Sequence, residues 1–209
     1  MEYEKELRES GQYSETDIQE KINKKKSIYE ILNNNSYDKI FEISDTQSDY
    51  YRKRGSPEKI VNLSGMHNKT YGTRQEELSR LQFNMEKNKS SAWDHNKLGK
   101  KIEQKSIRYS CKGCFGQYMH VEPAHKWDYL LLVKLDINEW ITYIVKRSSI
   151  EYFIESKQNF IRVQGNGDSY QGYLLNENIP EEIRDHHYTL IEDEKDLITY
   201  ITNDNFIIP

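Results

Sequence analysis

The sequence has little of the material that builds disulfide frameworks, membrane spans or large apolar cores. Its 209 residues include 2 cysteines and 4 prolines, and 35% of the residues are hydrophobic. Two cysteines cannot make a disulfide framework, which favours a reducing compartment. No run approaches the roughly 18 apolar residues of a transmembrane helix, and the charged first residues lack the apolar segment of a signal peptide. We therefore expect a soluble, intracellular protein that has no membrane partner.

Charged and aromatic residues are abundant instead. Charged side chains make up 31% of the chain and aromatic side chains 12%, and the mean hydropathy is −0.95. The aromatic content argues against wholesale disorder, and the length suits one full domain. Residues 1–65 are charged, Asn-rich and poor in apolar runs. We expect a loosely structured helical extension over residues 1–65 and a compact core domain over residues 66–209.

The net charge of −4 argues against a nucleic-acid partner, but the charge is unevenly distributed. Residues 97–126 contain seven Lys or Arg side chains and two Glu side chains, a local net charge of +5. A basic strip on an acidic protein is typical of an electrostatic footprint for phosphate groups, although charge fluctuation in a Lys-rich sequence explains it as well. The side chains of this strip that we expect to contact nucleic acid are Lys97, Lys100, Lys101 and Arg108.

Capping-box spacings predict helix starts at Ser14, Thr73 and Ser148. In the helix that starts at Thr73, Glu76 is explained as the second member of the capping box. Glu77 falls at the edge of the apolar stripe that faces the core. A carboxylate at that edge indicates a function, and Glu76 takes its place if the helix presents its other edge.

Apolar patterns predict a central sheet in the second half of the chain. Residues 127–136 are almost continuously apolar, as in a buried central strand, and residues 139–145 are rich in β-branched and aromatic side chains. Residues 100–111 read as a further strand, and residues 193–201 as a last short helix. The order of helices and strands predicts an α/β protein with a mixed central sheet flanked by helices.

Two charged side chains lie two residues apart in the strand predicted over 100–111. Glu103 and Lys105 project from the same face, because side chains alternate along a strand. If residues 91–94 form the neighbouring strand of a hairpin, Asp94 lies beside Glu103. Two adjacent carboxylates repel each other unless a divalent cation lies between them. Mg²⁺ accepts one or two carboxylates together with waters and phosphate oxygens, so the pair is an incomplete cage that a phosphodiester completes.

This arrangement resembles a known family. Asp94 followed by Glu103-Gln104-Lys105 is similar to the D…(D/E)xK signature of the PD-(D/E)xK nucleases, the restriction-endonuclease-like superfamily. The likeness extends over residues 71–146, where a helix, the Asp strand, the ExK strand and a buried strand follow one another. It implies a restriction-endonuclease-like fold in which Asp94 and Glu103 bind Mg²⁺, with Mn²⁺ as the expected substitute. Lys105 then serves the attacking water, and the helix contributes Glu77 as a further catalytic residue.

The resemblance also implies an activity and partners. Members of the superfamily hydrolyse DNA phosphodiester bonds, and those that cut both strands usually act as homodimers. We expect DNA as the partner and a Mg²⁺-dependent endonuclease as the function. Repair and recombination nucleases of the same fold are alternatives to restriction.

Two other interpretations stay open. Cys111, Cys114, His120 and His125 are of the types that bind Zn²⁺, although the histidine spacing matches no standard finger and unrelated loop residues explain the set as well. Glu103 and Lys105 are also compatible with a solvated strand face, in which case the chain is a non-catalytic DNA- or protein-binding module. Such a module is a decayed nuclease fold or a zinc-stabilised domain.

Overall fold

The structure is a computed structural model that describes residues 2–9, 13–34, 45–89, 92–165 and 167–204. The chain divides into two compact units, residues 1–40 and residues 41–209, and each is described by itself. The first unit contains the helices α1 (Glu2–Glu9) and α2 (Glu15–Asn34). Its buried apolar side chains form one small cluster: Leu7, Ile18 and Ile22.

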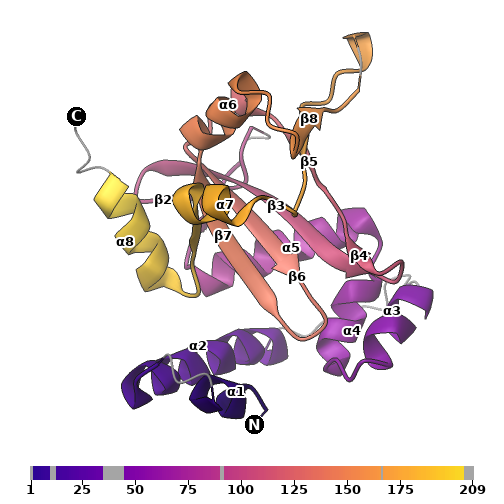
Figure 1. The fold of residues 1–209 in the computed structure, drawn as a ribbon, viewed down its shortest axis with the longest axis vertical. Coiled ribbons are helices and arrows are strands. Elements are labelled where there is room, and N and C mark those ends of the chain that lie inside the picture. Colours follow the sequence, from indigo (N-terminus) through magenta and orange to yellow (C-terminus); the bar gives the residue numbers. More distant parts are fainter. Residues whose placement is uncertain (1, 10–12, 35–44, 90–91, 166, 205–209) are drawn as a thin grey trace. The chain divides into compact units, whose positions relative to one another are not determined.

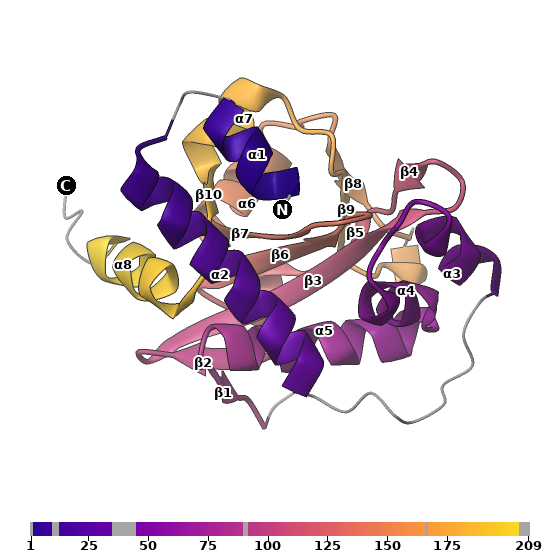
Figure 2. The same cartoon turned by 90° about the horizontal axis from the view of Figure 1, so that it is seen from below.

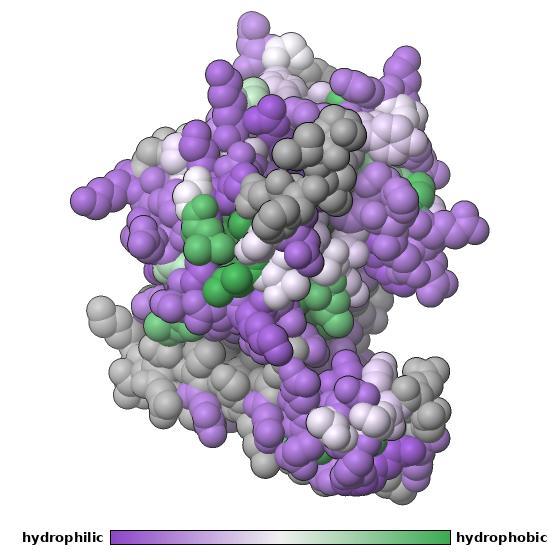
Figure 3. All heavy atoms as spheres, turned by 90° about the vertical axis from the view of Figure 1, so that its left-hand side faces the viewer, coloured by the Kyte–Doolittle hydropathy of each residue, from purple (hydrophilic) through white to green (hydrophobic). Residues whose placement is uncertain are grey.

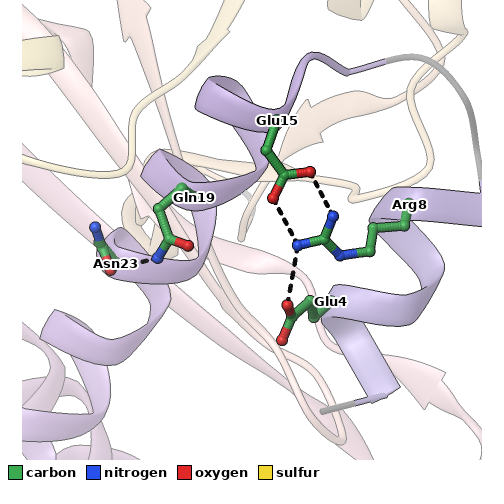
Figure 4. A network of polar contacts seen from close by, with 5 residues as sticks. All are labelled: Glu4, Arg8, Glu15, Gln19 and Asn23. Atoms are coloured by element: carbon green, nitrogen blue, oxygen red, sulfur yellow. Dashed lines mark hydrogen bonds and ion pairs between the residues drawn. The ribbon is translucent and has the colours of Figure 1, made fainter.

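The start of α2 has a local cause in the sequence. The Ser14 hydroxyl accepts a hydrogen bond from the Asp17 amide at 3.2 Å, and Asp17 accepts one from the Ser14 amide at 3.1 Å. The capping box predicted here is therefore confirmed. Arg8 of α1 donates to Glu15 of α2, at 2.6 Å from Nη2 to Oε1, and to Glu4 at 3.2 Å (Figure 4). These exposed ion pairs contribute little stability on their own.

The second unit contains the other described elements (Figure 1). Its helices are α3 (Asp45–Arg52), α4 (Glu58–Gly65), α5 (Asn68–Gln82), α6 (Arg147–Glu155), α7 (Glu181–His187) and α8 (Glu194–Asp204), with short 3₁₀ turns η1 (Pro123–His125) and η2 (Gly167–Ser169). Its strands are β1 (Glu86–Lys87), β2 (His95–Lys97), β3 (Lys100–Ser110), β4 (Cys114–Phe115), β5 (Tyr118–Val121), β6 (Tyr129–Leu135), β7 (Trp140–Lys146), β8 (Ile161–Val163), β9 (Tyr173–Leu175) and β10 (Tyr188–Leu190).

The strands form a mixed seven-stranded sheet and a small antiparallel sheet. The large sheet has the order β1-β2-β3-β6-β7-β10, with β4 paired to the far end of β3, and the small one has the order β5-β9-β8. The pair β3–β6 is parallel, whereas β2–β3 and β6–β7 are antiparallel. The mixed α/β architecture predicted from the sequence is confirmed.

Helices cover both faces of the large sheet, with α6 on one side and α4 and α5 on the other (Figure 2). On the α6 face, Leu130 and Leu132 pack in one cluster with Ile150 and Phe153 of α6. Glu103 pairs with Leu130 and Lys105 with Leu132 in the parallel register, so both charged residues belong to the α6 face.

On the α5 face, a second cluster joins the sheet to the helix ends. Ile102 and Leu131 pack there with Phe83, which follows α5, and with Leu197 of α8. Gln104 pairs with Leu131 in the same register, so its side chain belongs to the α5 face. Successive residues of β3 thus alternate between the two faces.

Two helix starts differ from the prediction. Helix α5 begins at Asn68, so Thr73 lies inside it and its hydroxyl donates to the Lys69 carbonyl at 3.2 Å. Helix α6 begins at Arg147, with Lys146 as its N-cap residue and no side-chain cap bond. Ser148 is therefore a helical residue. In both cases the helix begins before the Thr or Ser residue, so the capping-box spacing in the sequence does not mark a helix start.

Residues 45–65, predicted as part of a loose extension, pack in the second unit. The buried Tyr51 hydroxyl of α3 donates to the carbonyl of Leu135 at the end of β6 and to that of Tyr109 in β3, both at 3.1 Å. Ser56 donates to the carbonyl of Ile137 at 2.5 Å. These bonds join residues that are more than fifty positions apart, so no local sequence pattern predicts them.

The surface is predominantly polar. In the view of Figure 3, most of the coloured atoms belong to hydrophilic residues and the hydrophobic areas are small. Within the described residues, no helix combines the length and the apolar character that crossing a bilayer requires.

Candidate active site

The hairpin of β2 and β3 brings Asp94 to Glu103. His95 pairs with Ile102 in the antiparallel register, so the residue before β2, Asp94, falls opposite Glu103. The Asp94 amide donates to the Ile102 carbonyl at 3.1 Å. One oxygen of its carboxylate, Oδ2, accepts the Gln104 amide at 2.8 Å. The Asp94 carboxylate is therefore fixed on the backbone of β3.

The site lies where one edge of β3 is open. Strand β2 pairs only with residues 100–102, and β4 pairs with Tyr109 and Ser110. In the described part of the chain, no strand covers residues 103–108 on that side. Glu103 and Lys105 belong to this stretch.

Glu103 and Lys105 form a close, partly buried pair. The Lys105 ammonium donates to Glu103 Oε1 at 2.5 Å, and the two side chains are 10% and 20% exposed. Burial raises the pKa of Glu103 to about 7; Lys105 opposes this rise, while the charge of Asp94 adds to it. One lysine does not offset the burial and the acidic neighbour, so the site is short of positive charge.

Glu76, from α5, is the third carboxylate of the site. Burial raises its pKa to about 7, the charge of Asp94 adds to the rise, and nearby Arg80 and Lys105 lower it. Glu77 points elsewhere: it forms an ion pair with Arg74 at 2.5 Å, and its side chain is 42% exposed. The structure therefore brings Glu76, and not Glu77, to the other two carboxylates. The exchange follows from the face that α5 buries: Gln75, Leu78 and Ser79 are buried, whereas Leu81, one turn after Glu77, is 49% exposed.

Behind the site, on the α5 face, lies a buried polar chain that the sequence analysis missed. His95 Nε2 is 3.0 Å from Gln104 Oε1, and Gln104 Nε2 donates to Ser106 Oγ at 3.1 Å. Burial lowers the pKa of His95, and its bond to Gln104 partly opposes this. The signal was the polar Gln104 at a core-facing position of a strand, where an apolar residue is usual.

The four predicted nucleic-acid contacts divide into two groups. Lys97 is paired with Glu194 at 2.6 Å, and Arg108 donates to the Met66 carbonyl at 2.5 Å on the α5 face. Both are engaged within the fold, so Lys100 and Lys101 are the lysines that we carry forward as proposed phosphate contacts. Lys100 and Lys101 are partly exposed, and Lys101 projects on the same face as Glu103.

The donor set fits a hard divalent cation. Carboxylate oxygens are the ligands that Mg²⁺ prefers, and Asp94 is near enough to Glu103 for its charge to raise the pKa of Glu103. Across the described residues, no three or more His, Cys, Asp or Glu side chains converge in a group able to hold a metal. The protein thus offers Mg²⁺ two close carboxylates, which leaves the remaining positions to waters and phosphate oxygens.

The predicted zinc ligands do not form a site. Cys111 and Cys114 are free thiols at the turn between β3 and β4. His120 faces the Gln171 carbonyl, with Nδ1 at 3.3 Å from the oxygen. These residues and His125 are all described, and no metal-binding group includes them. The part of the chain that the structure describes therefore gives the zinc hypothesis no support, and it stays a prediction.

The raised pKa of Glu76 has a measurable consequence for stability. A group with a raised folded-state pKa stabilises the fold below its unfolded-state pKa, and this contribution is lost as the pH rises through about 7. We expect Glu76→Gln to raise Tm relative to the wild type at pH 8 but not at pH 5. One pKa unit corresponds to about 1.4 kcal/mol, so the gain at pH 8 is on the order of 1–2 kcal/mol after allowance for partial exposure.

Thermal unfolding at the two pH values checks this expectation. Glu77→Gln is the matched control, because it removes a carboxylate from the adjacent, exposed position of the same helix. Its effect on Tm should be small and similar at both pH values. A Glu76→Gln effect that is equally independent of pH would show that Glu76 is an ordinary surface carboxylate.

No protein-family model matches this chain, and no curated protein matches it either. Its chemistry therefore rests on the residues that form the site. These are Asp94, Glu103 and Lys105 at the open edge of β3, together with Glu76 of α5, whose charge acts on Glu103.

Proposed function

We propose that the chain is a Mg²⁺-dependent endonuclease that hydrolyses DNA phosphodiester bonds, with a restriction-endonuclease-like fold. The observation that carries this proposal is the register of the β2–β3 hairpin. The ladder ends at the pair His95–Ile102, and just beyond it the backbone of β3 binds the Asp94 carboxylate, while Lys105 is bonded to Glu103. The resemblance of these residues to the D…(D/E)xK signature supports the same reading.

Each residue has a role that follows from its position. Asp94 and Glu103 hold the cation, Mg²⁺ or Mn²⁺, which when bound polarises the phosphodiester and lowers the pKa of water. Lys105 orients the attacking water and offsets negative charge that develops on the phosphate. Glu76 adds negative charge on the α5 side of the pair, where it accepts a proton or assists a second ion.

DNA is held by contacts that carry no sequence information. Lys101 lies two residues before Glu103 on the same face, and Lys100 is adjacent to it. Lysines in such positions bind phosphates and set the register of the duplex. Cutting both strands calls for two active sites, so a homodimer is the assembly that we propose.

Supercoiled plasmid DNA tests the function most directly. With Mg²⁺, the purified chain should convert supercoiled plasmid into nicked and linear forms, and EDTA should stop the conversion. The Asp94→Asn variant, prepared in the same way, is the control for a contaminating nuclease. Equal conversion by the wild type and Asp94→Asn would reject the proposal.

A non-catalytic DNA- or protein-binding module is the second candidate. The observation in its favour is that no third ligand joins Asp94 and Glu103 in a metal-binding group among the residues described. Such a module binds its partner with or without Mg²⁺ and leaves plasmid intact. The plasmid experiment therefore separates the two candidates.

A further inference from the structure

A buried imidazole lies directly beneath the proposed metal site. His95 is 0% exposed and Gln104 is 4% exposed, and both lie on the α5 face beside the apolar Ile102. Burying polar side chains there costs free energy unless their hydrogen bonds are satisfied. Aliphatic residues would fill the same space without that cost, so packing alone does not explain why His95 and Gln104 are polar.

The hydrogen bonds define the tautomer of His95. The side-chain nitrogen of Gln104, Nε2, donates to the Ser106 hydroxyl at 3.1 Å. The side-chain oxygen of Gln104, Oε1, therefore faces His95 Nε2, at 3.0 Å. An amide oxygen only accepts, so Nε2 carries the proton and Nδ1 has the lone pair. The buried His95 is therefore a neutral donor to Gln104.

The other ring nitrogen of His95, Nδ1, has no hydrogen-bond partner among the described residues. Within the described residues, His95 Nδ1 and the Ser79 hydroxyl of α5 are both buried and have no hydrogen-bond partner. Tyr71 of α5 donates to the Ile107 carbonyl at 2.7 Å, and Phe83 shares a cluster with Ile102. Ser79 lies between these two anchor points, along the polar part of β3.

The same glutamine holds the metal-binding aspartate. The backbone amide of Gln104 donates to Asp94 Oδ2 at 2.8 Å. The side chain of Gln104 is bonded to His95, the residue that follows Asp94. Gln104 thus binds the end of β2 twice, through its backbone and through its side chain. This double link lies where the β2–β3 ladder stops. It adds to the bond from the Asp94 amide to the Ile102 carbonyl, and it is the contact that holds the Asp94 carboxylate itself.

We propose that His95 and Gln104 are positioning residues, a buried clamp that holds Asp94 against Glu103 and so sets the affinity of the site for divalent cations. The clamp rests on the proposed function, because the metal site is part of that function. It adds to that function by assigning control of metal binding to two residues that do not touch the metal. Partners of this kind usually change metal affinity by about 10- to 100-fold.

Two variants of the full chain remove the clamp without touching the carboxylates. Gln104→Met has a similar volume and keeps the backbone amide that binds Asp94, whereas His95→Leu removes the imidazole. Both should weaken the binding of Mn²⁺, measured by electron paramagnetic resonance, by about 10-fold or more. His95→Gln restores a donor and should bind Mn²⁺ more tightly than His95→Leu. Single-turnover cleavage at saturating Mn²⁺ should stay within about threefold of the wild type for Gln104→Met.

Thr142→Val is the matched control. Thr142 is a buried polar residue of β7 on the same α5 face, 2% exposed, and its hydroxyl also has no partner among the described residues. Val has nearly the same shape, so the substitution perturbs the packing of that face without reaching the clamp. Its Mn²⁺ affinity should equal that of the wild type, even if its Tm changes.

A second measurement tests the clamp independently of the proposed nuclease function. Hydrogen exchange of the Gln104 amide reports the bond to Asp94 whether or not a metal binds. Faster exchange at residue 104 in His95→Leu supports the clamp, and unchanged exchange overturns it. If the wild type binds Mn²⁺ and both clamp variants bind it with the same affinity, the clamp is also overturned. Wild-type protein that binds no Mn²⁺ overturns the proposed metal site, and the exchange measurement then decides on the clamp alone.

Discussion

Glu103→Gln is expected to reduce DNA cleavage in Mg²⁺ to the background level while leaving the fold as stable as before or more stable. The amide removes a charged ligand that the cation needs. Lys105 keeps an oxygen acceptor at the same position, so no buried donor is abandoned. Above pH 7 the variant should unfold at a higher temperature than the wild type, because burial raises the pKa of Glu103 to about 7 and penalises its ionised form.

The measurement is the initial rate of plasmid cleavage together with Tm for the wild type, Glu103→Gln and Glu77→Gln. Glu77→Gln makes the same chemical change in a carboxylate paired with Arg74 outside the site, and it should cleave at the wild-type rate. Cleavage by Glu103→Gln at a comparable rate would mean that the carboxylate lies on an ordinary strand face. Loss of cleavage in both variants would point instead to a general dependence on surface charge.

The parts of the fold that could be predicted from the sequence have local causes. Ser14 and Asp17 cap α2 through bonds that span three residues, and the apolar run of β6 reads as a buried strand because both its faces are covered. The parallel pairing of β3 with β6 and the packing of Tyr51 against the strand ends join residues far apart in sequence. Nothing within a short window fixes such contacts, so they were not predicted.

The same distinction applies to the candidate site. Glu103 and Lys105 share a face because strand residues alternate, and one hairpin places Asp94 opposite Glu103. The choice between Glu76 and Glu77 depends on which face of α5 packs against the sheet, since neighbouring helical residues point about 100° apart. The sequence places Leu81 on the buried face, but Leu81 is exposed. His95 was missed because a lone histidine beside a turn carries no pattern, although its partner Gln104 is a polar residue at a core-facing strand position.

Lys105→Met is expected to slow DNA cleavage by about 10²- to 10³-fold, the usual cost of losing one preorganised charge or donor in a transition state. DNA affinity should stay within about tenfold, because in the proposed complex Lys100 and Lys101 hold the phosphate backbone. A second effect follows from the pair itself. Lys105 holds the pKa of Glu103 below the value that burial and Asp94 would otherwise impose. Without Lys105 this pKa rises above about 7, so ionisation of the metal ligand requires a higher pH.

The pH dependence of single-turnover cleavage therefore tests the role of Lys105 better than one rate does. The rate of the wild type should increase as Glu103 ionises near pH 7, and the rate of Lys105→Met should increase at higher pH. Lys97→Met is the matched control, because Lys97 is a similarly buried lysine paired with a carboxylate, Glu194, outside the site. Lys97→Met should keep the wild-type rate and pH profile. A Lys105→Met variant with the same behaviour would show that Lys105 only neutralises the charge of a strand face.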